Sequence, residues 1–410
     1  MTPSLLFTII LAIIIINFLF ELLLNYLNAK HFKDNLPSEL NDIYDEEGYQ
    51  NSQNYKQVNY KFGLIQSVFS FALLILFIAL NGFKLLDDFV RLLNDNKMLI
   101  SLLYFGFIFL ASTIISLPFS YYHSFVIEER FGFNKMTKSL FVKDTLKSLL
   151  LGILLGGLIL SIILWFYQQF PKSFWLYAWA FMAVFSILMN LFYTSLIVPL
   201  FNKLSPLEDG DLKNTLQEFA EKVQFRIDKI FIIDGSKRST KANAYFSGFG
   251  KSKKVVLYDT LLNDLSNDEI AAVLAHEVGH YKKKHIIFNL ILSLLLTGFT
   301  LFILSLFINN PLLAKAFGIA NSNFHIGVIA FMILYTPISV ITGLLMNILS
   351  RKFEYQADGY AKQFGYADTL ISSLKKLSKQ SFSNLTPHKL YVFINYSHPT
   401  LLQRFKNLKQ

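Results

Sequence analysis

Hydrophobic residues along this 410-residue chain gather into long stretches separated by polar segments. A bilayer hydrocarbon core is about 30 Å thick, and about 20 apolar helical residues cross it. The first stretch has no basic residues before it and no small-residue cleavage site, so we interpret it as a span and not as a signal peptide. The pattern predicts about seven transmembrane helices, at residues 3–20, 62–83, 98–122, 148–171, 173–199, 286–308 and 326–349.

The polar segments divide the chain into four parts. Residues 1–199 hold five of the predicted spans and two polar loops, at 27–61 and 119–147. Residues 200–284 form a small subdomain on the cytoplasmic side, and residues 285–349 hold the last two spans. Residues 350–410 form a polar, largely helical tail with a Pro and Asn break near 384–399.

The subdomain combines helical and strand patterns. Residues 206–225 have helical periodicity, and 266–284 open with Ser, Asn and acidic residues, which predicts a helix starting near Asp268. Short β-rich runs predict strands at 229–233, 243–248 and 253–258. The predicted fold class is therefore mostly α, a polytopic membrane protein with a small α/β subdomain.

Composition and charge support this class. The chain is 53% hydrophobic and only 16% charged, which is too apolar for an ordinary soluble protein. A net charge of +10 could indicate a nucleic-acid partner. However, most Lys and Arg residues lie in alternate polar segments, as expected for the cytoplasmic loops of a membrane protein. We therefore expect membrane lipid and not nucleic acid as a partner, with the N-terminus outside and residues 200–284 and the tail in the cytoplasm. The absence of cysteine excludes disulfides, thiolate metal ligands and a thiol nucleophile.

The segment HEVGH carries the first candidate chemistry. His276 and His280 are four residues apart, so on a helix their rings share one face. Neutral imidazoles at this spacing suit tetrahedral Zn²⁺, and Glu277 lies beside them, where it can take a proton from an activated water. Five-residue patterns of this kind also occur by chance, so the motif alone leaves the metallopeptidase hypothesis open.

A third ligand is required, because a catalytic zinc site has three protein ligands. After the seventh predicted span, Glu354 and Asp358 are also four residues apart. We expect Glu354 to bind the metal and Asp358 to hydrogen-bond a ligating histidine. The alternative is an acidic helix face in water beside Arg351 and Lys352.

Near the C-terminus, His398 and Arg404 are candidate donors to the oxyanion that forms when water attacks a peptide carbonyl. By themselves they are two basic residues in a polar tail. The other histidines show no ligand spacing and are assigned interfacial or structural roles. His285, which follows three lysines, is expected at the cytoplasmic headgroup level.

Taken together, HEVGH, KFEYQADGYA (352–361), DGSKRSTKANAYFSGFG (234–250), FVIEERFGFN (125–134) and IVPLFNKLSPLEDGDL (197–212) resemble the integral-membrane type I CAAX prenyl endopeptidases. The resemblance covers most of the chain. It implies seven spans around a water-filled chamber, one zinc ion per chain and a peptide or protein substrate, which is a prenylated CAAX protein in the eukaryotic members. It also implies that His276, His280 and Glu354 bind zinc and that Glu277 is the base.

The remaining site residues also follow from the resemblance. It makes Asp358 the outer carboxylate and gives His398 and Arg404 a role in transition-state stabilisation. It makes Asn243, Ala244, Tyr245 and Phe246 an edge strand for substrate backbone, and an exposed edge can accept an extended peptide by strand addition. The alternative for this segment is a buried strand closed by a Gly turn.

Several alternatives stay open at this point. The chain end NLKQ has no dilysine retrieval signal and the chain is short for this family, which favours a bacterial inner membrane. A bacterial enzyme could act in membrane-protein quality control or peptide clipping without prenylation. A channel or transporter with an accidental HExxH motif fits the ligand set less well. Two other protease classes, the heat-shock-type membrane proteases and the intramembrane site-2 proteases, fit the span count or the position of the ligands less well. The oligomeric state is left open.

Overall fold

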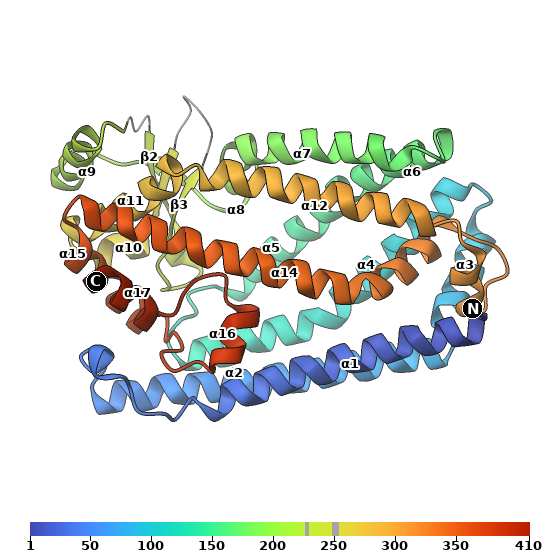
Figure 1. The fold of residues 1–410 in the computed structure, drawn as a ribbon, viewed down its shortest axis with the longest axis horizontal. Helices are drawn as coiled ribbons and strands as arrows, with labels where there is room; N and C mark the ends of the chain where they lie inside the picture. The colour runs from blue at the N-terminus through green and yellow to red at the C-terminus, as the bar shows by residue number, and fades with distance from the viewer. Residues whose placement is uncertain (226–228, 248–253) are drawn as a thin grey trace.

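A computed structural model of the protein describes residues 1–225, 229–247 and 254–410 (Figure 1). The long helices lie along the length of the molecule, with a small sheet near one end and the short helix α3 (Gly82–Leu93) at the other. Seven helical segments in the described residues are long and apolar enough to cross a membrane, as predicted. They are α1 (Pro3–Lys30), α2 (Glu46–Ala79), α4 (Lys97–Tyr122) with η2 (His123–Glu128), α5 (Lys138–Leu151) with η3 (Gly152–Gly156) and α6 (Gly157–Gln169), α7 (Phe174–Leu196) with α8 (Val198–Phe201), α12 (His285–Phe307) and α14 (Phe324–Gln363).

The two predicted polar loops are mostly helical, so this part of the prediction is wrong. α2 begins at Glu46, where the Asp45 side chain accepts a hydrogen bond from the amide of Gly48 at 2.9 Å. The segment predicted as a loop at 119–147 is interrupted only between Glu128 and Lys138, apart from caps. Hydropathy detects only the apolar part of a helix, whereas these helices continue as capped polar extensions beyond the hydrocarbon core.

The spans surround an open interior. Within the described residues, each span buries only 6–17% of its most apolar window inside the protein. In α4, residues 109–112 and 114–118 are exposed, which covers the full circumference of the helix. One stripe at four-residue spacing, Ser112, Ser116 and Ser120, is polar and exposed. A spanning helix exposed on every side contacts lipid with its apolar face and an open polar space with the other, as a chamber requires.

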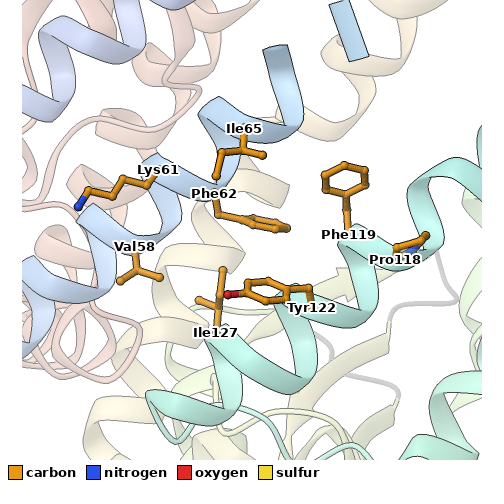
Figure 2. Close-up of a pocket in the computed structure, with 8 residues that line it drawn as sticks. All are labelled: Val58, Lys61, Phe62, Ile65, Pro118, Phe119, Tyr122 and Ile127. Atoms are coloured by element: carbon orange, nitrogen blue, oxygen red, sulfur yellow. The ribbon is translucent and has the colours of Figure 1, made fainter. Parts of the chain in front are cut away.

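An apolar cavity of about 440 Å³ lies between α2 and α4, near their polar extensions (Figure 2). Aromatic rings from both helices face one another across it, and the rings of Phe62 and Tyr122 stack with centroids 5.4 Å apart. Among the described residues, Lys61 is the only charged one that lines it. The complete lining is Val58, Lys61, Phe62, Ile65, Pro118, Phe119, Tyr122 and Ile127.

The subdomain sheet has the strand order β1-β2-β4-β3 among the described residues. β2 and β4 are parallel, whereas β1 pairs with β2 and β3 pairs with β4 in antiparallel register. The three predicted strands are present, and β1 and α10 (Asp259–Asp264) were not predicted. The remaining elements of the subdomain are β1 (Leu204–Pro206), α9 (Asp211–Lys222), β2 (Lys229–Ile233), η4 (Gly235–Lys237), β3 (Ala244–Ser247), β4 (Lys254–Tyr258) and α11 (Asn267–Lys282).

The C-terminal tail packs against this subdomain. Leu370 and Ile371 of α15 (Ala367–Gln380) and Leu408 of α17 (Leu401–Lys409) join one buried cluster with residues of α9, β4 and α11. The break predicted near 384–399 contains the short helix α16 (Lys389–Asn395). The other short helices are η1 (Ser38–Leu40) and α13 (Pro311–Ala316). The tail is therefore part of the folded unit that contains α11.

Candidate metal centre

The two helices that carry the candidate ligands pack closely at one glycine. α11 begins with a capping box between Ser266 and Glu269, one residue before the predicted start. At Gly279, an added Cβ would lie 3.0 Å from the backbone of Ala357 on α14. Because real Cβ atoms rarely approach backbone this closely, glycine permits the contact. The glycine of HEVGH therefore allows α14 to bring its acids against the two histidines.

Donor atoms from three residues converge where these helices meet. The Nε2 atoms of His276 and His280 are 3.2 Å apart. Oε2 of Glu354 is 3.4 Å from Nε2 of His276, and Oε1 is 3.2 Å from Nε2 of His280. These three residues are the group in the described part of the chain that could hold a metal ion.

The triangle fits a tetrahedral metal ion. Bonds of 2.0–2.1 Å with tetrahedral angles separate two donors by about 3.3–3.4 Å. The separation of the two Nε2 atoms is close to this spacing, and each ring nitrogen lies at a similar distance from a different oxygen of the Glu354 carboxylate. Oε2 of Glu354 is buried and makes no hydrogen bond among the described residues, although Nη1 of Arg404 lies 3.6 Å away, so this acceptor is available to a metal ion. The donor set, two imidazoles and one carboxylate, is one that binds catalytic zinc.

Asp358 binds His276 through the ring nitrogen that faces away from the triangle. Its Oδ1 lies 2.8 Å from Nδ1 of His276, so the ring donates from Nδ1 and turns Nε2 toward the triangle. Arg404 donates to both carboxylate oxygens, from Nε at 2.9 Å and from Nη2 at 2.5 Å. Burial and Arg404 lower the pKa of His276, but the carboxylates of Asp358 and Glu354 raise it more, to about 9. The site therefore favours positive charge at the triangle.

Glu277 and His398 lie on the more open side of the centre. Glu277 is half-buried. Burial lowers the pKa of the Arg404 guanidinium, but the carboxylate of Asp358, and to a smaller extent those of Glu354 and Glu277, raise it more. The His398 side chain is 64% exposed, with Nε2 3.5 Å from Oε1 of Glu354. His398 and Arg404 also line a cavity of about 420 Å³ between α15 and the chain before α17. All seven residues predicted around the metal therefore lie together, with Arg404 engaged mainly by Asp358.

The predicted substrate strand is an edge strand. β3 spans Ala244–Ser247, follows Asn243 and pairs with β4 on one side only among the described residues. Phe246 takes part in the backbone register opposite Val255. The side chain of Tyr245 packs beside β4 in a small buried cluster, and burial raises its pKa. The strand therefore offers a backbone edge, which is the feature that peptide addition requires.

The segment before β3 is fixed to the membrane helices. Nζ of Lys241 lies 2.7 Å from Oε2 of Glu128 and 3.0 Å from Oη of Tyr55. The amide of Thr240 donates to the carbonyl of Phe133 at 3.1 Å. The motif 125–134 thus positions the chain that enters β3, a contact that sequence analysis did not identify.

Sequence analysis did not predict the burial of one histidine. His285 was expected at the headgroup level, but it is only 3% exposed. Its Nδ1 is 3.1 Å from Nδ1 of His280, and its Nε2 is 2.8 Å from Oε1 of Gln356. The sequence contains one indication that His285 belongs to the site, namely its position five residues after His280. This spacing does not correspond to a known arrangement of metal ligands.

A fold of seven spans with a buried His–His–Glu centre defines a membrane metallopeptidase, and comparison with known proteins gives the family. Residues 25–203 match the family model described as CAAX prenyl protease N-terminal, five membrane helices. Residues 206–410 match peptidase family M48. The chain belongs to this family and is a metalloendopeptidase of the membrane.

Individual relatives agree over almost the whole chain. CAAX prenyl protease 1 of Saccharomyces cerevisiae is 39% identical, over 96% of this chain and 93% of its own length. The human CAAX prenyl protease 1 homolog is 31% identical, over 91% and 88%. The crystal structure of S. mikatae Ste24p aligns with a TM-score of 0.94, at 37% identity and 99% coverage of both chains. These relatives are eukaryotic, so they give the predicted bacterial membrane no support.

Proposed function

We propose that the protein is a zinc-dependent endopeptidase that cleaves prenylated CAAX-type substrates near their C-terminus. The observation that carries the proposal is the triangle of His276, His280 and Glu354, with Glu277 beside it. The names of the relatives supply the substrate class. The open interior of the spans gives a lipid-linked peptide a route to an aqueous centre.

Each residue has a defined part in this reaction. A zinc ion bound by the triangle would lower the pKa of a water molecule and polarise the scissile carbonyl. Glu277 takes a proton from the attacking water and passes it to the leaving amine. His398, exposed beside the triangle, donates to the developing oxyanion. Arg404 fixes Asp358, and Asp358 fixes the ring of His276.

The edge of β3 is proposed to hold the substrate backbone. Asn243, Ala244, Tyr245 and Phe246 offer main-chain donors and acceptors on the side away from β4. Because Lys241 ties the preceding chain to Glu128, this edge keeps a fixed position relative to the spans.

Replacement of the base tests the mechanism. We expect Glu277→Gln to keep stoichiometric zinc and to lose cleavage of a farnesylated CAAX peptide by a factor of about 10²–10⁴. Asp268→Asn is the matched control, because it makes the same chemical change at an exposed position of α11. Wild-type turnover in the Glu277 variant would overturn the mechanism.

The substrate is tested with one peptide in two forms. Faster cleavage of the farnesylated form supports prenyl recognition. Equal rates would favour a broader role in peptide clipping or membrane-protein quality control.

The metal centre is proposed to face the cytoplasm, whichever membrane holds the protein. The concentration of Lys and Arg in alternate segments supports this orientation. The chain has no cysteine, so single cysteines at Thr2 and Gln410 can be labelled in sealed vesicles with an impermeant maleimide. Opposite accessibility of these two positions is expected, and equal accessibility would contradict the proposed topology.

A further inference from the structure

The turn after α11 returns the chain to the metal centre. α11 ends at Lys282, and Lys284 adopts a left-handed conformation with φ of 59° before α12 begins at His285. The imidazole of His285 stacks on Phe353 of α14, with ring centroids 4.1 Å apart and planes 11° from parallel. Hence His285 sits against both helices that carry the ligands, although it belongs to the following span.

Its hydrogen bonds permit only one arrangement of protons when His280 binds a metal. Nε2 of His280 faces the triangle and must keep its lone pair for the metal, so the proton lies on Nδ1. That Nδ1–H points at Nδ1 of His285 over 3.1 Å, which must then accept. Neutral His285 carries its own proton on Nε2, and this proton is donated to Oε1 of Gln356 at 2.8 Å.

We propose that His285 is a positioning residue that holds His280 in the metal-binding tautomer, with Gln356 holding His285 in turn. The inference deepens the proposed function and rests on it. Metal-bound histidines usually donate their other ring nitrogen to such a partner, and loss of the partner weakens metal binding about 10–100-fold.

The two ligating rings therefore have different supports. His276 donates to a carboxylate, Asp358, whose charge is matched by Arg404. His280 donates to a neutral imidazole, which adds no negative charge near the metal. A metal ion with fewer anions around it is the stronger Lewis acid, so a neutral partner favours the activation of water.

A packing role for His285 predicts a different result. If the ring only fills space beside Phe353, an aromatic replacement should preserve the centre and a small polar one should damage it. If the hydrogen bond from His280 to His285 is what holds the ligand, the small polar replacement should preserve the centre and the aromatic one should damage it. His285→Phe keeps the stacked ring but has no acceptor, whereas His285→Asn loses the ring but places an amide oxygen near the position of Nδ1.

The experiment measures zinc Kd by chelator competition, on the full chain in detergent, together with the thermal stability of the metal-free forms. We expect His285→Phe to raise the Kd about 10–100-fold and His285→Asn to raise it less than about tenfold. The stability of the metal-free protein should fall more in the Asn variant, because that variant loses the stacked ring.

The opposite order, with wild-type Kd in the Phe variant and a large increase in the Asn variant, would overturn the inference. A wild-type Kd in both variants would do the same while leaving the proposed function intact. Absence of stoichiometric zinc in the wild type would instead remove the proposed function, and the inference with it.

Discussion

Helix α14 carries a buried histidine–carboxylate cluster at each end, and the two clusters differ in one respect. Near its start, His325 lies 2.8 Å from Oδ1 of Asp87 through Nε2 and 3.0 Å from Oγ of Ser101 through Nδ1. Arg91 donates to the second oxygen of Asp87 at 3.0 Å. Burial raises the pKa of Asp87, but the bonds to His325 and Arg91 lower it more, so the acid stays charged. Near the other end, Glu354 and Asp358 meet His276 and His280.

The difference lies in which atoms are satisfied. Both ring nitrogens of His325 have partners, and His325, Asp87 and Ser101 are each at most 3% exposed. At the other end, the Nδ1 atoms have partners, whereas the two Nε2 atoms face each other and the carboxylate of Glu354. A structural histidine uses both nitrogens within the protein, and a metal ligand keeps one nitrogen free. The sequence contains both kinds; their spacing selects the candidate ligands, and the geometry shows how the partners of the two kinds differ.

Removal of the metal is the strongest test of this contrast. We expect 1,10-phenanthroline to abolish peptide cleavage, and added zinc to restore it, because the converging donors have no other role. The cluster at Asp87 should be unaffected, so the fold should stay intact by circular dichroism. Cleavage that persists after zinc has been shown to be removed would contradict the assignment.

A matched pair of variants gives the next largest effect. Asp358→Asn removes the charge that His276 and Arg404 share, and we expect the zinc Kd to rise about 10–100-fold. Asp87→Asn makes the same change at the other end of α14 and should leave the Kd within experimental error. Chelator competition on both variants measures this, and equal increases would show that the two clusters do not differ as described.

The same pair gives a smaller effect on stability. In Asp87→Asn, His325 and Arg91 lose charge-assisted hydrogen bonds, so the free energy of unfolding should fall by about 2 kcal/mol. Thermal unfolding in detergent measures this change. A wild-type melting temperature in the Asp87 variant would show that the cluster does not fasten α3 and α4 to α14.

The prediction from sequence was successful where the determinants are local. The capping residues before α11 and the β-rich runs 229–233 and 253–258 gave these elements to within about one residue. Spacing of four on two helices was enough to select the candidate ligands. The exposed edge of β3 follows from strand order, which the sequence suggested only through resemblance.

The remaining features depend on distant contacts. The first helical turns of α2 are polar, and no hydropathy window identifies them as part of a span. His285 follows three lysines, which masks its burial, and its contact with Gln356 joins residues 71 positions apart. The bond between Lys241 and Glu128 joins two segments that are separated by the fourth and fifth spans.

The uninterrupted length of α14 fixes how far above the lipid the chemistry takes place. Its 40 residues extend for about 60 Å, which is twice the thickness of a hydrocarbon core. Glu354 therefore lies on a continuous transmembrane helix, only a few residues beyond its apolar stretch. For the lipid-linked substrate proposed above, this fixed height would set the distance required between the lipid anchor and the scissile bond.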